Sequence, residues 1–270
     1  MRVERVADPG DPRLDDYRDV RDPERRLARG QFVAETSDVV AALVACGRFP
    51  VESLLATEAS LAALGGVVDA LPSGTPVYVA SHAVIQAVVG FRFHRGCLAV
   101  GRRVAEPSLS EVLALDPRLV VLCEDLVNPD NVGGVFRNAL AFGADAVLLS
   151  SRCCDPLYRK VVRVSMGAVL RVPFARMTDW GAGLERLREA GFAVLALTTS
   201  GGVDVGELAS LPERVAVLVG AEGEGLGAAS REAASMRVTI PMAPGVDSLN
   251  VATAAGIVLW RVGRRGSARR

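Results

Sequence analysis

The sequence has 270 residues, half of them apolar, and its 31 basic and 31 acidic side chains give a formal net charge of zero. This length and apolar content exclude an intrinsically disordered chain and allow one large domain or two medium ones. The zero net charge excludes binding to nucleic acid through the field of the whole protein and leaves that role to local basic patches.

The first thirty residues are polar and charged, with apolar residues at wide spacing, and this pattern predicts a solvated helical lead-in. From Gln31 onward, strand-like runs alternate with helical ones. The strand-like runs are QFVA, VESLLAT, TPVYVA and GCLAVG, and the helical segments are 36–47, 58–70 and 81–89. The alternation predicts a small α/β domain, which we place at 1–103.

The stretch GRRVAEPSLSEVLALDP has two prolines and no strand pattern, so we predict a linker at 104–115 that leads into a short helix. A second α/β domain is predicted at 116–270. Its strand-like runs are LVVLCEDL, DAVLLS, RVPF, FAVLAL, RVAVLVG and SMRVTIP, and its helices are 131–142, 155–168, 180–190 and 250–263. Such continuous apolar runs are typical of a parallel sheet buried on both faces. No apolar run reaches the length of a membrane span, so we expect no membrane partner.

The five cysteines form no C-x-x-C pair, and the chain shows no signal-peptide pattern. An odd number of cysteines without such a pattern favours a reducing, cytoplasmic location. Cys123 lies in a strand-like run and is expected in the core. Cys153 and Cys154 are adjacent in a loop, where a redox role is the alternative to a structural one.

Three later segments contain the residues that can carry chemistry. The first is NPDNVGGVFRNALAFGA at 128–144, where Asn131 is a candidate helix cap. Gly133 and Gly134 remove side chains at the helix start, where backbone N–H groups can face an anion. Arg137 follows within two turns. The simplest interpretation is a capped helix with a solvated arginine.

The second segment is LVGAEGEGLG at 218–227. It is neither a Walker loop nor the dinucleotide fingerprint, because its glycines stand at 220, 223, 225 and 227. A flexible turn is the alternative to a ligand-binding loop. Glu222 and Glu224 would repel phosphate and favour a cationic or neutral ligand.

The third segment is PMAPGVDSLNVATAAG at 241–256. Two prolines shape its first part, and Asp247, Ser248 and Asn250 precede a helical apolar run. Each of these three residues can cap a helix, but one helix start does not require all three.

Together the three segments resemble the motifs of the SpoU (TrmH-like) RNA ribose methyltransferases of the SPOUT superfamily. The matching residues are Asn131, Gly133 and Arg137 in the first motif, Gly220, Glu222, Gly223 and Gly225 in the second, and Ile240, Pro241, Met242, Ser248, Leu249, Asn250 and Val251 in the third. The resemblance is close over about 119–263. It is weaker over 31–100, which is similar to the small RNA-binding domain that often precedes the catalytic one.

The resemblance implies an α/β fold in which a C-terminal trefoil-knotted SPOUT domain with a parallel sheet follows the small RNA-binding domain. It implies S-adenosylmethionine as cofactor, held by backbone groups near Gly220, Ile240 and Leu249. It also implies a homodimer that pairs through the knot region. The sulfonium of this cofactor is cationic and tolerates neighbouring carboxylates.

The implied reaction is methyl transfer to a ribose 2′-hydroxyl of RNA, and we expect ribosomal RNA ahead of transfer RNA as the partner. Arg137 has the central role in this family reading, with Asn131, Glu222, Ser248 and Asn250 positioning it and the RNA. A guanidinium group resists giving up its proton, so we expect Arg137 to clamp a phosphate and stabilise the developing alkoxide. Whether it also accepts the proton stays open. Local arginines can bind RNA phosphates, namely Arg92, Arg95, Arg102 and Arg103.

Two other interpretations stay open: a non-catalytic RNA-binding protein of the same fold, and an α/β enzyme with a nucleotide cofactor such as NAD. The intact motif residues disfavour the first, and the missing dinucleotide fingerprint disfavours the second. Titration with S-adenosylmethionine and with NAD separates all three.

Overall fold

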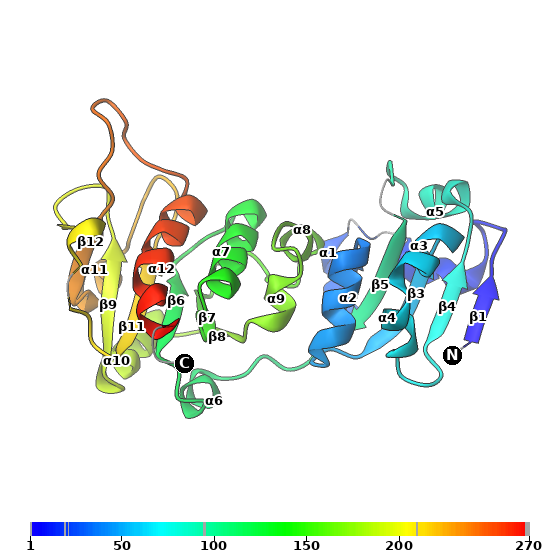
Figure 1. Cartoon of the computed structure of the whole chain (residues 1–270), viewed down its shortest axis with the longest axis horizontal. Helices are drawn as coiled ribbons and strands as arrows, with labels where there is room; N and C mark the ends of the chain where they lie inside the picture. Colours follow the sequence, from blue (N-terminus) through cyan, green and yellow to red (C-terminus); the bar gives the residue numbers. More distant parts are fainter. Residues whose placement is uncertain (1, 19, 21, 94–95, 209, 268–270) are drawn as a thin grey trace. The chain divides into compact units, whose positions relative to one another are not determined.

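A computed structural model describes residues 2–18, 20, 22–93, 96–208 and 210–267 (Figure 1). The chain forms two compact units. Unit 1 comprises Met1–Ala105 and Pro156–Arg171, and unit 2 comprises Glu106–Asp155 and Val172–Arg270. The chain first passes from unit 1 to unit 2 close to the predicted linker, and a later segment of it returns to unit 1.

Unit 1 contains a five-stranded mixed sheet in the order β1-β4-β3-β5-β2. Its strands are β1 (Arg2–Arg5), β2 (Gln31–Glu35), β3 (Val51–Ala56), β4 (Pro76–Val79) and β5 (Cys97–Arg102). β1 and β3 pair with β4 in parallel, and β2 and β3 pair with β5 antiparallel. The α-helices in the first part of unit 1, Met1–Ala105, are α1 (Pro23–Ala28), α2 (Ser37–Cys46), α3 (Glu58–Leu64), α4 (Gly66–Asp69) and α5 (His82–Val89).

The prediction of a solvated lead-in over the first thirty residues is wrong. β1 is an edge strand of the sheet, and the short helix η1 (Pro12–Tyr17) places Leu14 and Tyr17 in the core. The Tyr17 hydroxyl is satisfied by the Ser53 hydroxyl at 2.7 Å. Charged neighbours mask these apolar anchors in the sequence, since the strand has four residues and the buried residues are isolated.

The predicted helix at 155–168 is also wrong in extent, because the structure has two short helices, α8 (Arg159–Val164) and α9 (Ala168–Arg171). Met166 and Gly167 both have positive φ, at 52° and 76°, which ends α8. This segment packs within unit 1, where the buried Glu35 carboxylate of β2 accepts a hydrogen bond from Arg159 at 2.6 Å.

Unit 2 contains a seven-stranded sheet in the order β10-β12-β9-β11-β6-β7-β8, and every pairing is parallel. Its strands are β6 (Leu119–Cys123), β7 (Ala146–Ser150), β8 (Phe174–Met177), β9 (Phe192–Leu197), β10 (Val203–Asp204), β11 (Arg214–Val219) and β12 (Met236–Thr239). The prediction of a parallel sheet is confirmed. The strand predicted at RVPF begins only at Phe174, directly after Pro173, which cannot donate to a ladder.

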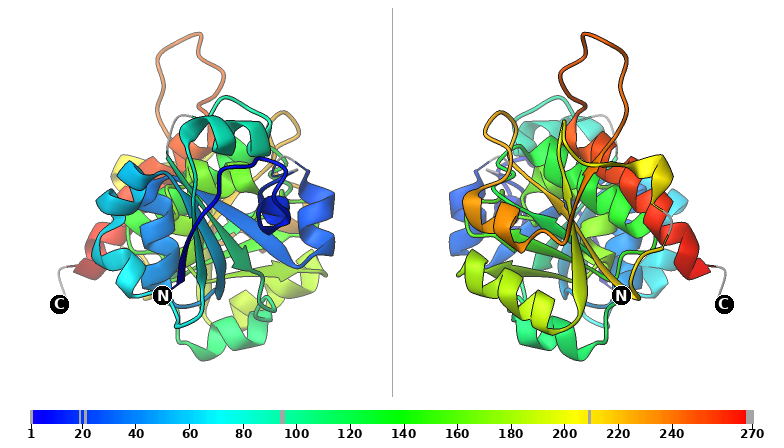
Figure 2. Two further views of the ribbon diagram at one scale, coloured as in Figure 1. Left: turned by 90° about the vertical axis from the view of Figure 1, so that its right-hand side faces the viewer. Right: turned by 90° about the vertical axis from the view of Figure 1, so that its left-hand side faces the viewer.

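Helices cover both faces of this sheet, as the apolar runs predict (Figures 1 and 2). The helices are α6 (Leu109–Ala114), α7 (Pro129–Ala141), α10 (Trp180–Glu189), α11 (Ala228–Ala233) and α12 (Val251–Ser267), with a short turn η2 (Val205–Glu207). On one face, Val120 and Leu122 of β6 share an apolar cluster with Leu184 and Leu187 of α10. α7 and α12 lie side by side and contact β7 and β11.

The close packing of α7 against α12 depends on glycine. A Cβ atom at Gly134 would lie 2.6 Å from the Cβ atom of Ala252, and one at Gly256 would lie 2.8 Å from Nδ2 of Asn138. The Asn138 amide donates to the carbonyl oxygen of Ala252 at 2.7 Å. The two helices therefore approach more closely than larger side chains would allow.

Among the described helices, none combines the length and apolar character that crossing a membrane requires.

Candidate cofactor pocket and active site

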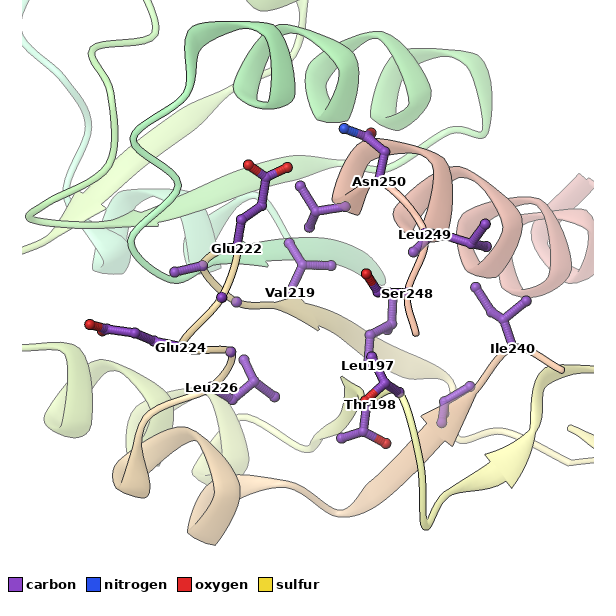
Figure 3. Close-up of a pocket in the computed structure, with 18 of the residues that line it drawn as sticks. Leu197, Thr198, Val219, Glu222, Glu224, Leu226, Ile240, Ser248, Leu249 and Asn250 are labelled. Atoms are coloured by element: carbon purple, nitrogen blue, oxygen red, sulfur yellow. The ribbon is translucent and has the colours of Figure 1, made fainter. Parts of the chain in front are cut away.

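A cavity of about 720 Å³ opens where β9, β11 and β12 end in unit 2 (Figure 3). Ligands of parallel α/β sheets bind at these carboxyl ends, and the volume is within the ~300–1,000 Å³ of cofactor sites. The cavity is lined by Leu197–Thr199, Val219–Leu226, Arg231, Val238, Ile240, Met242, Ser248–Val251 and Ala254. The three residues predicted to hold the cofactor, Gly220, Ile240 and Leu249, are all among them.

The glycine loop after β11 folds back on itself to form one wall. The Gly225 N–H donates to the Ala221 carbonyl at 3.0 Å, and Gly223 and Gly225 have φ values of 88° and 70°. A Cβ atom at Gly220 would lie 2.6 Å from the carbonyl oxygen of Gly225. The loop is thus closed by backbone contacts that side chains at these glycines would prevent.

Two buried polar side chains hold this loop and the helix α11 that follows it. Glu124, which is only 8% exposed, accepts a hydrogen bond from the Gly227 N–H at 3.0 Å. The Glu124 N–H donates to the Val219 carbonyl at 2.9 Å, which ties both ends of the loop to β6. The buried Ser230 hydroxyl accepts from the Trp180 indole at 2.9 Å and fixes α11 to α10. Sequence reasoning missed Glu124, because only its contacts distinguish it from a surface glutamate.

The opposite wall comes from the segment between β12 and α12, which projects from the rest of unit 2 (Figure 1). Its tip is a turn closed by the Val246 N–H and the Ala243 carbonyl at 3.2 Å, with Gly245 at a φ of 85°. The chain leaves the pocket after Met242 and returns at Ser248. In Figure 3, Ile240 and Leu249 lie at the end of the pocket opposite Glu224.

A directed chain of hydrogen bonds joins the three motifs. The Asn250 amide donates to Oδ1 of Asn131 at 2.8 Å, and the Asn131 amide donates to the Glu222 carboxylate at 2.6 Å. Oδ1 of Asn250 accepts from the N–H of Ala252 at 3.0 Å and caps α12. Asn131 is 3% exposed, so its amide is committed to these partners. The carboxylate of Glu222 is therefore held at the pocket rim by α7 and by the start of α12.

The prediction that Asn131 caps α7 is wrong. The helix begins at Pro129, and its cap is Asn128, whose side chain accepts from the Asp130 N–H at 2.9 Å. Asn131 stands one turn later and faces the second and third motifs instead. The absent side chain of Gly134 likewise makes room for Ala252 and not for an anion.

Arg137 is set apart from the other predicted catalytic residues. It lies exposed on α7 and does not line the pocket, whereas Glu222, Ser248 and Asn250 do. Within the described residues, its guanidinium group makes no ion pair or hydrogen bond. Its five N–H donors are therefore available to a ligand.

The loop cysteines have no activated thiol. Burial raises the pKa of the Cys153 thiol, and it raises the pKa of Cys154 to about 11 with help from the charge of Asp155. Cys153 also accepts a hydrogen bond from the N–H of Leu126 and donates to the Cys123 carbonyl. Since the thiolate is the reactive form, these contacts support a structural role. Among the described residues, no cluster of three His, Cys, Asp or Glu side chains is placed to hold a metal ion.

Comparison with known proteins places this pocket in a family context. The profile of the SpoU rRNA methylase family matches residues 118–260. An uncharacterized tRNA/rRNA methyltransferase of Mycobacterium bovis is 44% identical, over 98% of this chain and 93% of its own length.

Two solved structures share the fold over both units. An rRNA methyltransferase from Sinorhizobium meliloti with bound AdoMet superposes with a TM-score of 0.83 at 25% identity, over 98% of each chain. A structure described as an RNA 2′-O ribose methyltransferase has a TM-score of 0.78 at 26% identity, over 98% of this chain and all of its own.

Proposed function

This chain belongs to the SpoU rRNA methylase family and is a tRNA/rRNA methyltransferase that uses S-adenosylmethionine, and on that premise we propose that it methylates a ribose 2′-hydroxyl. We propose ribosomal RNA as the substrate ahead of transfer RNA. The observation that carries the proposal is the hydrogen-bond chain from Asn250 through Asn131 to Glu222, which gathers the three motifs at one rim of the pocket.

The pocket fits the cofactor in size and in charge. Its volume of about 720 Å³ accommodates a nucleoside with an amino-acid tail. Backbone groups near Gly220, Ile240 and Leu249 would hold the cofactor, since these residues form facing walls. The two carboxylates in the lining, Glu222 and Glu224, suit a cation. When bound, the cofactor supplies an electrophilic methyl group on its sulfonium sulfur.

The protein's own residues have the task of orienting and stabilising the attacking oxygen. The exposed guanidinium of Arg137 is suited to bind a phosphate beside the reacting ribose and to stabilise the alkoxide that develops. We propose that Glu222, Ser248 and Asn250 orient the ribose from the pocket rim, where Asn131 holds Glu222. Alignment of the hydroxyl with the methyl group contributes much of the rate.

The remaining parts of the proposal concern the whole chain. We propose that 1–103 select the RNA and that 116–270 form the methyltransferase domain, with a trefoil knot and a homodimer as the family resemblance implies. The arginines proposed to contact RNA phosphates in the first part are Arg92, Arg102 and Arg103, and a fourth, Arg95, lies outside the described residues. The proposed location is the cytoplasm.

The test is methyl transfer from labelled S-adenosylmethionine to purified ribosomal RNA and transfer RNA, followed by nucleoside analysis. We expect 2′-O-methylnucleosides, mainly in ribosomal RNA. Label on a base would contradict the ribose assignment, and transfer to tRNA alone would contradict the substrate order. Mapping of ribose methylation in cells with and without the gene then identifies the nucleotide.

A further inference from the structure

Among the described residues that line the pocket, Arg231 is the one basic residue. It lies on α11, directly after the glycine loop, and sequence reasoning did not single it out. The other charged residues of the lining are Glu222 and Glu224. The pocket thus contains two negative groups and one positive group, and each charge must face some part of the bound cofactor or the solvent.

Hydrogen bonds hold the backbone of Arg231 and one end of its exposed side chain. Its N–H donates to the Gly227 carbonyl at 3.1 Å, and its neighbour Ser230 is buried and bonded to Trp180. One guanidinium nitrogen of Arg231 donates to the carbonyl oxygen of Leu226. This contact uses one end of the guanidinium fork and holds the group at the pocket wall.

In the described part of the chain, no carboxylate neutralises the charge of Arg231 through an ion pair. The single hydrogen-bond partner of its guanidinium group there is the neutral Leu226 carbonyl. Oε1 of Glu222 accepts a hydrogen bond from Asn131 and not from Arg231. An arginine beside a cofactor pocket with free donors suits a carboxylate, which it can bind through two parallel hydrogen bonds.

S-adenosylmethionine carries one carboxylate, one ammonium group and one sulfonium. The charges of the cofactor and the pocket are therefore opposite in sign and equal in number, because the pocket lining contains two carboxylates and one guanidinium. The glutamates suit the two cationic groups, which leaves the guanidinium for the carboxylate. Resting on the proposed function, we propose that Arg231 binds the carboxylate of the cofactor's methionine moiety.

A competing role for Arg231 is support of the glycine loop through the Leu226 carbonyl alone. The two roles differ in what they predict for ligands without the carboxylate. A loop support affects every ligand of the pocket equally. A carboxylate contact affects only ligands that possess the carboxylate, so a cycle of protein and ligand changes separates them.

The experiment measures dissociation constants by calorimetry for S-adenosylmethionine, S-adenosylhomocysteine and decarboxylated S-adenosylmethionine. The proteins are the unmodified chain, Arg231→Gln, Arg231→Lys and the control Arg237→Gln. Arg237 is exposed on the adjacent β12 and does not line the pocket, so its variant makes the same charge change elsewhere.

We expect Arg231→Gln to weaken binding of both carboxylate-containing ligands about 10- to 100-fold, the range for a hydrogen bond to a charged group. Binding of the decarboxylated ligand should change less than about twofold, and Arg231→Lys should keep part of the affinity. The unmodified protein should bind the decarboxylated ligand more weakly than S-adenosylmethionine. This last comparison requires no variant to fold.

Equal weakening for all three ligands, or no weakening for any, would overturn the carboxylate contact while the proposed function stands. Failure of the unmodified protein to bind S-adenosylmethionine would overturn the proposed function and this inference together. The two failures are therefore distinguishable.

Discussion

Arg137 is exposed on α7 without an intramolecular partner in the described residues, so its side chain contributes little to folding. We expect Arg137→Ala to keep its melting temperature and its affinity for S-adenosylmethionine. Methyl transfer should fall by about 10²-fold or more, as for the loss of a group that stabilises developing negative charge. Arg137→Lys should recover only part of the rate, because lysine lacks the planar fork.

Arg188→Ala is the matched control for this variant. Arg188 is also an exposed arginine on a helix of unit 2, and it does not line the pocket. Its loss should leave both binding and transfer unchanged. A variant at Arg137 that keeps most of the activity, or one that loses cofactor binding, would refute the role assigned to it.

Gly220 tests the closed form of the glycine loop. A Cβ atom there would lie 2.6 Å from the Gly225 carbonyl oxygen and 2.8 Å from a methyl group of Leu226. We expect Gly220→Val to displace the loop backbone and to weaken binding of S-adenosylmethionine at least tenfold, equivalent to about 1.4 kcal/mol or more. Calorimetry measures the loss. Unchanged affinity would mean that the pocket lies elsewhere.

Much of the candidate site could be predicted from sequence, but the contacts within it could not. The motif residues Glu222, Ser248 and Asn250 stand out as polar groups beside glycine and proline. Asn131, by contrast, suggests a helix cap, because its partners lie 91 and 119 residues away in the sequence. Arg231 carries no local signal at all, since its significance depends on the charges that face it.

At the scale of elements, the pairing of α7 with α12 links the fold to the site. Asn131 is on α7 and Asn250 caps α12, so their hydrogen bond needs the close approach that Gly134 permits. We expect Gly134→Ala to destabilise the protein by about 1–3 kcal/mol through overpacking against Ala252. It should also weaken cofactor binding, because α12 and the segment before it would shift. Thermal unfolding and calorimetry give the two readouts.

Gly181→Ala serves as the control for helix glycines. A Cβ atom at Gly181 would meet only Asp179 at 3.8 Å, an ordinary contact. Alanine there should leave stability unchanged or raise it slightly, since it favours a helix more than glycine does. If Gly134→Ala behaves like Gly181→Ala, then the two helices tolerate a wider spacing and the site does not depend on their approach.

Local composition decides which of the strands can be predicted from the sequence. The strands β6, β7, β9 and β11 are apolar runs buried on both faces, so their composition alone identifies them. β10 has two residues and depends on pairing with β12, which no local pattern encodes. The division of 155–168 into two helices depends on the positive φ of Met166, a residue that rarely adopts it.

At the scale of the whole molecule, Pro156–Arg171 joins unit 1 although it lies within the C-terminal half of the sequence. Its residues Val161, Val162, Ala168, Val169 and Leu170 are almost fully buried. In a chain that begins at Glu106, the first part of unit 1 would be missing and would no longer cover this apolar segment. We therefore expect it to melt at a lower temperature than the full chain and to aggregate.

Addition of a separate 1–105 fragment during refolding should restore part of that stability. Both chains can be followed by thermal unfolding and gel filtration. RNA affinity of the shortened chain is informative only if it folds. A stable, monodisperse chain from Glu106 onward would show that the segment does not need unit 1.

The proposed homodimer makes a prediction about α12. In the described chain, α12 packs on α7 and β11, while Thr253, Ile257 and Trp260 follow one another at helical spacing on a more open face. Trp260 is 44% exposed, and an exposed aromatic residue on such a face is a candidate interface anchor. We expect Trp260→Glu to shift the protein toward a monomer in sedimentation, with little change in melting temperature at high concentration, because the residue is not part of the core of unit 2. If a partner subunit helps to complete the RNA site, dilution of the unmodified protein should reduce its methyl transfer in parallel with the mass of the sedimenting species. Trp260→Glu should show that loss at higher concentrations.

Thr253→Glu, about two turns before Trp260 on the same face of the helix, should act in the same direction if the interface covers this face. A clean monomer of about 28 kDa that keeps full activity at low concentration would rule out an obligate dimer.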